Sequence, residues 1–230
     1  MLTLFHSPLS SGCRFIRLIL GEYSVSTQLI VEYEWARRHE FLALNPAGHV
    51  PVLLAEHEVP LSGATVIFEY LDETRGSLLQ ENKFFPENPL DRAEVRRLND
   101  WFLNKFENEA TRHIVRERID KREMPLAIGG GAPNSQILRN ARANIRPHMN
   151  YLNWLCASRD WLVGSKLSYA DLAAAAAISV LDFLGEIDWE HSPAAKDWYM
   201  RIKSRPSFRP LLTDRIRGIA ASPHYGDLDF

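Results

Sequence analysis

A proline next to an apolar run near residue 50 restricts the fold more than any other single feature. The run from Val50 to Leu54 is apolar and is expected to form a strand. Proline has no amide hydrogen to donate to a neighbouring strand, so it is tolerated where a strand begins and not in its middle. The sequence therefore predicts that Pro51 begins the strand, behind a cis bond that turns the backbone of Val50 outward toward a ligand.

Short apolar runs alternate with helical patterns over the first 75 residues. Phe15, Leu18 and Ile19 recur at helical spacing and predict a helix over about residues 11–22. The other expected elements are strands at 2–5, 27–31, 52–54 and 57–59, a short helix within 34–45, and a helix at 64–73, with Ala55-Glu56 as a tight turn. This order of strands and helices predicts an α/β domain.

Everything after a proline- and glycine-marked linker has a helical pattern. Two long helices are expected, over about 90–121 and 135–158, separated by a glycine-rich turn. That turn lacks the Gly-Lys-Ser/Thr ending of a phosphate loop. The expected parts are residues 1–75, a linker at 76–88, a helical domain at 89–217 and a tail at 218–230.

Composition excludes several classes of protein. The chain has 230 residues with 46% hydrophobic residues, which is enough for a core, and its net charge of −2 predicts no attraction to nucleic acid or to an anionic membrane. Cys13 and Cys156 are not spaced as a disulfide framework or a metal site. Because no apolar run approaches about 18 residues and no signal peptide is evident, a cytoplasmic protein is expected.

Two motifs carry a family resemblance. The stretch Asn45-Pro-Ala-Gly-x-Val-Pro followed by Ile-Phe-Glu-Tyr-Leu-Asp-Glu resembles the glutathione S-transferase superfamily. Ser168-x-x-Asp171 before an alanine-rich run is similar to that superfamily's (S/T)-x-A-D box. The resemblance implies an α/β plus all-α fold, with an N-terminal thioredoxin-like domain followed by an all-helical domain.

The Ser168 box is predicted to be structural. In a capping box the serine hydroxyl accepts from the amide of the third helical residue, here Asp171, while the Asp171 carboxylate accepts from the Ser168 amide. The two residues are therefore expected to start a buried helix.

The first turn contains the candidate catalytic residue. Ser-Pro-Leu-Ser-Ser-Gly-Cys-Arg resembles the bacterial transferase pattern SP-x-S-x-x-x-R-x-x-R, which implies that Ser10 activates the glutathione thiol and matches Arg14 and Arg17. The alternative is that Ser10 or Ser11 only caps the helix. Cys13 then packs in the core as a small apolar residue.

The cofactor site is degenerate at its second half. The Val50 backbone is still able to pair with the cysteinyl part of glutathione, but Gly63-Ala64 stands where the superfamily has Glu-Ser. These residues offer no carboxylate for the γ-glutamyl ammonium and no hydroxyl for its carboxylate. Each lost hydrogen bond to a charged group removes about 1.5–3 kcal/mol, so glutathione binding is expected to be weak or absent.

These departures resemble one branch, the GST-like division proteins of bacteria that bind the tubulin-like GTPase FtsZ. That resemblance implies a cytoplasmic homodimer that binds FtsZ filaments, curves or bundles them, and promotes constriction at midcell. The alternative is a glutathione S-transferase or related glutathione-dependent enzyme that uses Ser10.

The branch resemblance thus implies a non-catalytic protein with FtsZ polymers and a second copy of itself as partners, and with no cofactor and no metal.

Two residues outside the expected core are predicted to contact the partner. Trp35 lies in a charged segment, where it either packs on the aliphatic parts of arginines or serves as an exposed anchor. Asp227 lies in an acidic and aromatic tail that is expected to dock on the body or on a partner. Neither residue is expected to be needed for the cofactor pocket.

The expected dimer places the helix after Pro89 at the interface. Arg92, Arg96 and Arg97 lie near Trp101 and Phe102, a mixture that suits a protein interface. The alternative is that the two aromatic residues point into their own helical bundle.

Overall fold

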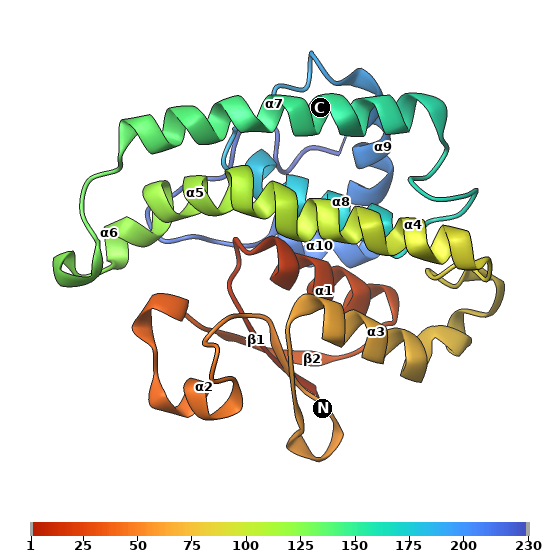
Figure 1. Cartoon of the computed structure of the whole chain (residues 1–230), viewed down its shortest axis with the longest axis horizontal. Coiled ribbons are helices and arrows are strands. Elements are labelled where there is room, and N and C mark those ends of the chain that lie inside the picture. The colour runs from red at the N-terminus through yellow and green to blue at the C-terminus, as the bar shows by residue number, and fades with distance from the viewer. Residues whose placement is uncertain (1, 229–230) are drawn as a thin grey trace.

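A four-stranded sheet forms the base of the computed structural model, which describes residues 2–228 (Figure 1). The strands follow the order β2-β1-β3-β4. Their bounds are β1 Leu2–His6, β2 Thr27–Val31, β3 Val52–Leu54 and β4 Pro60–Ser62. β1 and β2 are parallel, and helix α1 (Ser11–Glu22) makes the crossover between them, whereas β3 pairs antiparallel with both β1 and β4.

Helices cover both faces of the sheet. Successive side chains of a strand point to opposite faces, so each inner strand packs on both sides. Leu4 and Leu53 belong to the large core shared with α1 and with α3 (Ala64–Arg75). Phe5 and Val52 point the other way and pack with Phe41 of α2 (His39–Leu44). Two-sided burial explains why these strands have continuous apolar runs.

The hairpin after β3 differs from the expected one. The second strand is β4 at Pro60–Ser62 and not residues 57–59, because the turn η2 (Glu56–Glu58) includes the first two of those positions. His57 and Glu58 both have positive φ, which ends any extended conformation there. Pairing begins with Leu54 opposite Pro60, and the proline fits because β4 is an edge strand.

The helical domain lies on α1 and α3 (Figure 1). Its first long helix is continuous but mixed, and α7 is the second. The bounds are α4 Pro89–Asp100, π-helical η4 Trp101–Thr111, α5 Arg112–Val115, π-helical η5 Arg116–Asp120, α6 Lys121–Glu123, η6 Leu126–Ile128, α7 Ser135–Ser158, α8 Tyr169–Phe183, α9 Pro193–Lys203, η7 Pro206–Phe208 and α10 Arg209–Leu212. A further turn, η3 (Gly76–Asn82), joins the two parts. Both predicted long helices are confirmed.

Helix α8 is the centre of the helical domain, and all of its residues are buried. Asp171 accepts four hydrogen bonds, from the Ser168 amide at 2.9 Å, the Ser168 hydroxyl at 2.7 Å, the Leu162 amide at 2.9 Å and Trp198 Nε1 at 2.9 Å. The Ser168 hydroxyl both accepts from the Asp171 amide and donates to the Asp171 carboxylate. Both halves of the predicted capping box are therefore confirmed.

The two aromatic residues predicted at the dimer interface, Trp101 and Phe102, differ in burial. Phe102 is fully buried in its own helical domain, so the prediction that it lies at an interface is wrong. Trp101 is half-buried, and its ring lies 4.5 Å from that of Tyr151. Trp154 follows on the same helix as Tyr151 and is 61% exposed.

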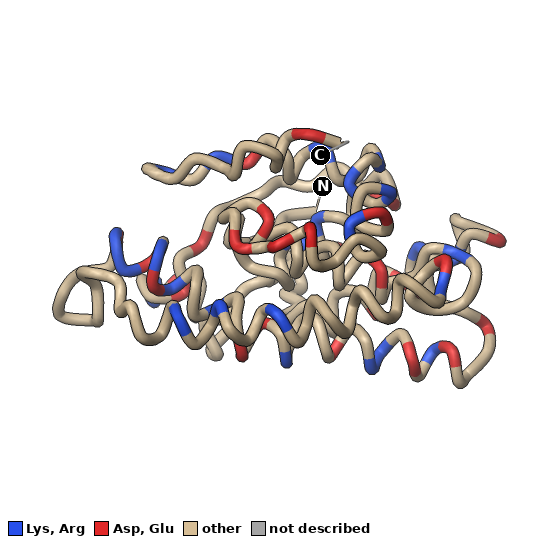
Figure 2. The backbone as a smooth tube through the Cα atoms, turned by 90° about the horizontal axis from the view of Figure 1, so that it is seen from above, with Lys and Arg blue, Asp and Glu red and all other residues tan. Residues whose placement is uncertain are grey.

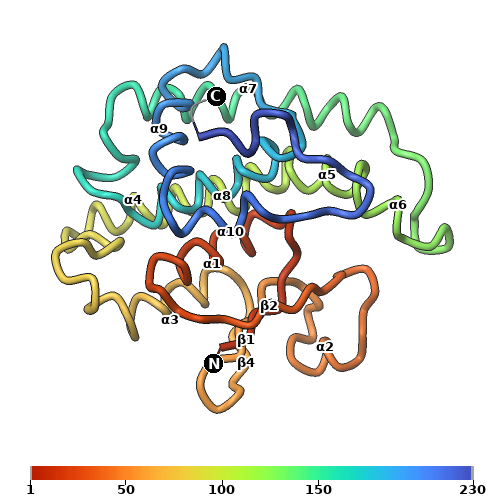
Figure 3. The backbone as a smooth tube through the Cα atoms, turned by 180° about the vertical axis from the view of Figure 1, so that it is seen from behind, coloured from red at the N-terminus to blue at the C-terminus, as the bar shows by residue number. Residues whose placement is uncertain are grey.

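The chain after α10 crosses the back of the helical domain (Figure 3). Tyr225 is 1% exposed and packs edge-on against Phe183, and the Ser222 amide donates to the Phe183 carbonyl at 2.8 Å. Docking of the tail on the body is therefore confirmed as far as Tyr225, whereas Leu228 is 41% exposed. Phe230 lies outside the described residues.

Charged residues of both signs are interspersed along the elements (Figure 2). Within residues 2–228, no helix combines the length and the apolar character needed to cross a bilayer. Arg14 and Arg17, the two arginines of the transferase pattern, are buried, and Arg17 forms a bidentate pair with Asp214 at 2.8 Å for both bonds. They tie α1 to the segment after α10.

Candidate functional site

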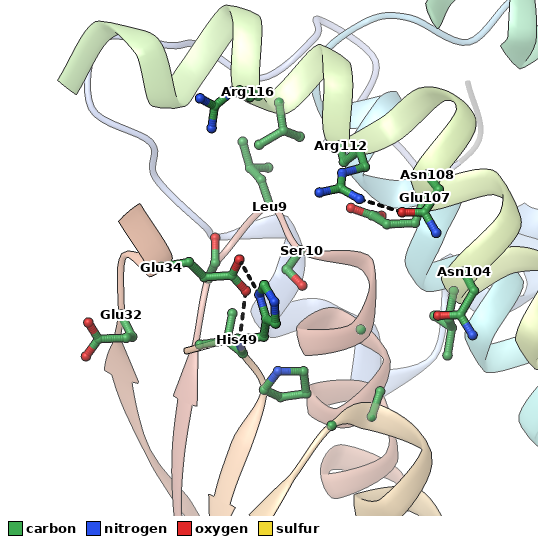
Figure 4. A pocket seen from close by; sticks show the side chains of 18 of the residues that line it. Leu9, Ser10, Glu32, Glu34, His49, Asn104, Glu107, Asn108, Arg112 and Arg116 are labelled. Carbon is green, nitrogen blue, oxygen red and sulfur yellow. Dashed lines mark hydrogen bonds and ion pairs between the residues drawn. The ribbon is translucent and has the colours of Figure 1, made fainter. Parts of the chain in front are cut away.

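A cleft of about 580 Å³ opens between the sheet domain and the long mixed helix (Figure 4). It collects six of the residues that the sequence singled out, namely Ser10, Trp35, Val50, Pro51, Gly63 and Ala64. The opposite wall comes from η4, α5 and η5, with Asn104, Glu107, Asn108, Arg112, Arg116 and Asp120. Ser168, Asp171 and Asp227 do not line it.

Ser10 is at the N-terminus of α1 with its hydroxyl on the cleft. Its backbone is extended, and its hydroxyl oxygen accepts from the Cys13 amide at 3.3 Å, so the capping role is confirmed. Activation of a thiol by the same hydroxyl stays a prediction. Cys13 itself is fully buried, and burial raises the pKa of its thiol to about 12, which keeps it protonated.

The backbone of Val50 already has a partner. The Val50–Pro51 bond is cis, as predicted, and Pro51 immediately precedes β3. The Val50 amide donates to Glu34 Oε1 at 2.9 Å, and Glu34 Oε2 lies 3.1 Å from His49 Nδ1. The amide is thus satisfied by Glu34 from the turn η1 (Glu34–Ala36), and pairing of the Val50 backbone with the cysteinyl part of glutathione stays a prediction.

Gly63 and Ala64 leave the neighbouring part of the cleft without functional side chains. Gly63 has φ of +91°, and none of the described heavy atoms lies within 4 Å of the place a Cβ would take. A glutamate at this position would fit the space but would adopt a strained backbone. Ala64 is the first residue of α3 and carries no hydroxyl.

The helical wall holds two carboxyl groups with raised pKa values. Burial raises the pKa of Glu107 to about 7, against the lowering effects of the Ser11 hydroxyl, which donates to Glu107 Oε2, and of Arg112. Burial likewise raises the pKa of Asp120 to about 6. Carboxyl groups of this kind exchange protons near neutral pH and leave the cleft less negative than its acidic residues suggest.

Trp35 lines the cleft. The ring is half-buried and its centroid lies 5.4 Å from that of Tyr33. Its Nε1 is buried and has no hydrogen-bond partner among residues 2–228. Asp227 is exposed in the tail, away from the cleft lining.

A metal centre finds no support in the part of the chain that the structure describes. No group of three or more His, Cys, Asp or Glu side chains there is arranged to hold an ion.

Comparisons with known proteins identify the family of this fold. The model of the glutathione S-transferase N-terminal domain matches residues 4–81, and that of the C-terminal domain matches residues 133–206. The chain belongs to the glutathione S-transferase family. A glutathione S-transferase from Sinorhizobium meliloti 1021 is 57% identical, with a TM-score of 0.98 and full coverage of both chains.

Two further proteins are similar to this chain over nearly its full length. FtsZ-localized protein A from Caulobacter vibrioides is 41% identical over 232 residues, which cover 99% of this chain and 98% of that protein. The structure of FzlA from C. crescentus has a TM-score of 0.89 at 41% identity and covers 100% of this chain and 99% of that one.

The sequence did not point to Glu34, Glu107 and Asp120 as residues of this cleft. Glu34 was visible only as one charge among several around Trp35, and its contact with Val50 depends on a fold that brings residues 16 positions apart together. Glu107 directly follows the core residue Phe106 in a helix. An acidic residue next to the apolar face of a helix is therefore the sequence signal that could have indicated it. Asp120 had no comparable signal.

Proposed function

We propose that this protein is a GST-like cell-division protein that associates with FtsZ filaments. The observation that carries the proposal is the 41% identity to FtsZ-localized protein A over nearly the full length of both chains. By this proposal the protein acts in the cytoplasm at midcell, where it curves or bundles filaments and promotes constriction.

The geometry of the cleft supports a role other than glutathione transfer. The Val50 amide is bonded to Glu34, and Gly63 and Ala64 supply neither a carboxylate nor a hydroxyl. Glutathione binding in this site then requires displacement of Glu34 and still lacks the γ-glutamyl contacts. We infer that glutathione binds weakly or not at all.

The proposed recognition residues are Trp35 and Asp227. Trp35 offers a partly exposed aromatic surface at the cleft, which is the residue type most enriched at binding hot spots. Asp227 offers an exposed charge that orients a partner.

A homodimer is part of the same proposal. Two equivalent subunits present two filament contacts, which raises the effective concentration of the second contact once the first has formed. This multivalency accounts for bundling without any further chemistry.

The decisive experiment combines co-sedimentation on FtsZ polymers with retention on immobilised glutathione. The proposal expects co-sedimentation without retention. The competing enzyme hypothesis is favoured by the position of Ser10 on the cleft and expects retention, together with conjugation of glutathione to an aryl halide that disappears in Ser10→Ala. Retention without co-sedimentation would overturn the proposal.

Substitutions locate the contact. Trp35→Ala and Asp227→Lys are expected to weaken co-sedimentation by about tenfold each, because truncation of a hot-spot residue typically costs 1–2 kcal/mol or more. Asp227→Asn should have a smaller effect than Asp227→Lys. Glu190→Lys reverses an exposed charge between α8 and α9 and serves as the matched control. Unchanged binding by both Trp35→Ala and Asp227→Lys would place the contact elsewhere.

A further inference from the structure

One buried arginine connects the cleft to the C-terminal tail. Arg14 is 0% exposed, and its Nε donates to the Pro8 carbonyl at 2.6 Å. Its Nη1 donates to the Tyr225 hydroxyl at 2.8 Å and to Ser179 Oγ of α8 at 2.9 Å. Its Nη2 faces Asp214 Oδ2 at 3.5 Å. The guanidinium is thus shared among segments that are far apart in the sequence.

The first of these segments shapes the cleft. Pro8 lies between Ser7 and Leu9, which both line the cleft, and the Ser10 amide closes the turn on the Ser7 carbonyl at 3.2 Å. A bond to the Pro8 carbonyl therefore holds the loop 7–10, here called the cleft loop, from behind.

The second segment is the tail. Tyr225 precedes the exposed Asp227 by two residues, and its hydroxyl also donates to the Leu211 carbonyl at 3.3 Å. The Arg14 guanidinium lies 5.8 Å from the centroids of the Tyr225 and Phe183 rings. The tail beyond Tyr225 takes its position from this anchor.

We infer that Arg14 is a positioning residue that couples the cleft loop to the tail, so that a change in either segment alters the other. A guanidinium is planar and rigid, and its donors point in fixed directions. When one acceptor is lost, the buried charge must turn toward the remaining acceptors, and the bond to the Pro8 carbonyl turns with it. For partner binding, the inference rests on the proposed function, because Arg14 then sets Asp227 relative to the cleft.

The tail has other anchors that do not involve Arg14. The Ser222 hydroxyl donates to the Asp182 carbonyl at 2.7 Å, and Lys203 Nζ donates to the His224 carbonyl at 3.2 Å. Ser222→Ala therefore loosens the tail without touching the guanidinium, which makes it a matched control for Tyr225→Phe.

Hydrogen exchange tests the coupling without any partner. Tyr225→Phe and Ser179→Ala each remove one acceptor of Arg14, and Ser179 belongs to neither segment. Both are expected to raise exchange of the Ser10 amide and of the Tyr225 amide by about tenfold, as for the loss of one hydrogen bond to a charged group. Ser222→Ala should raise exchange in the tail alone.

Two results would overturn the inference. One is faster exchange in the tail with an unchanged cleft loop in both Arg14-directed variants. The other is a uniform rise that includes the α8 amides, since this marks a general loss of stability.

Co-sedimentation provides the functional arm. Ser179→Ala is expected to weaken binding to FtsZ polymers by about three- to tenfold, with the assay run well below the Tm of the variant so that the protein is folded. If the unaltered protein does not bind FtsZ, the proposed function fails, and the exchange data still decide the coupling. Full binding by Ser179→Ala despite altered exchange would overturn the link to recognition.

Discussion

At the scale of single residues, Glu34 distinguishes this cleft from a glutathione site in which the Val50 amide has no protein partner. Glu34→Ala releases the Val50 amide, which then has no partner in the cleft. One regained main-chain hydrogen bond contributes about 0.5–1.5 kcal/mol, so glutathione should bind about two- to tenfold more tightly than to the unaltered protein. Isothermal titration at millimolar glutathione measures the change.

The control for that titration is Glu40→Ala. Glu40 is an exposed acid in the same region and makes no bond to Val50. An equal gain in both variants would mean that reduced negative charge, and not the freed amide, attracts the peptide.

Glu107 makes stability depend on pH, also at the scale of one residue. Its pKa is raised from 4.5 to about 7, so between these values the folded protein holds a proton that the unfolded chain has released. Stability therefore falls as pH rises through this window. Glu107→Gln stays neutral and should gain stability relative to the unaltered protein by on the order of 2 kcal/mol from pH 5 to pH 8. Urea unfolding at both pH values checks this, with exposed Glu73→Gln as the control.

At the scale of elements, α8 depends on the carboxylate at its start. Asp171 is fully buried and accepts four hydrogen bonds, so Asp171→Ala leaves buried donors unsatisfied. We expect a loss of about 3–5 kcal/mol in the free energy of unfolding, against about 1 kcal/mol for Ser168→Ala. Chemical denaturation measures both. Similar losses for the two variants would contradict a central role of the carboxylate.

Elements were predictable where their signal is local. The helix Ser11–Glu22, the strand Thr27–Val31 and the helix Ser135–Ser158 follow from periodicity and flanking turn residues alone. The strand β4 was misplaced because positive φ at His57 and Glu58 has no signature in those residue types. The tertiary contact of Glu34 with Val50 has no local signal at all, which is why the cleft looked open from the sequence.

At the scale of the whole molecule, the two domains form one body around α1 and α8. The fold follows from two motifs and the order of elements, whereas the assembly depends on which aromatic residues stay exposed. Phe102 fills the helical core, but Trp101, Tyr151 and Trp154 form a continuous row of rings on the outside. A row of this kind on a helical face suits a protein interface.

The dimer prediction is therefore moved to this row. Light scattering at micromolar concentration should give twice the chain mass of 26.4 kDa. Trp154→Glu should give a monomer, because a charge in the centre of a desolvated contact has no partner to compensate it. Leu126→Glu is the control, since Leu126 is 82% exposed in the turn η6. A monomeric unaltered protein would refute the dimer, and a dimeric Trp154→Glu variant would place the interface on another face.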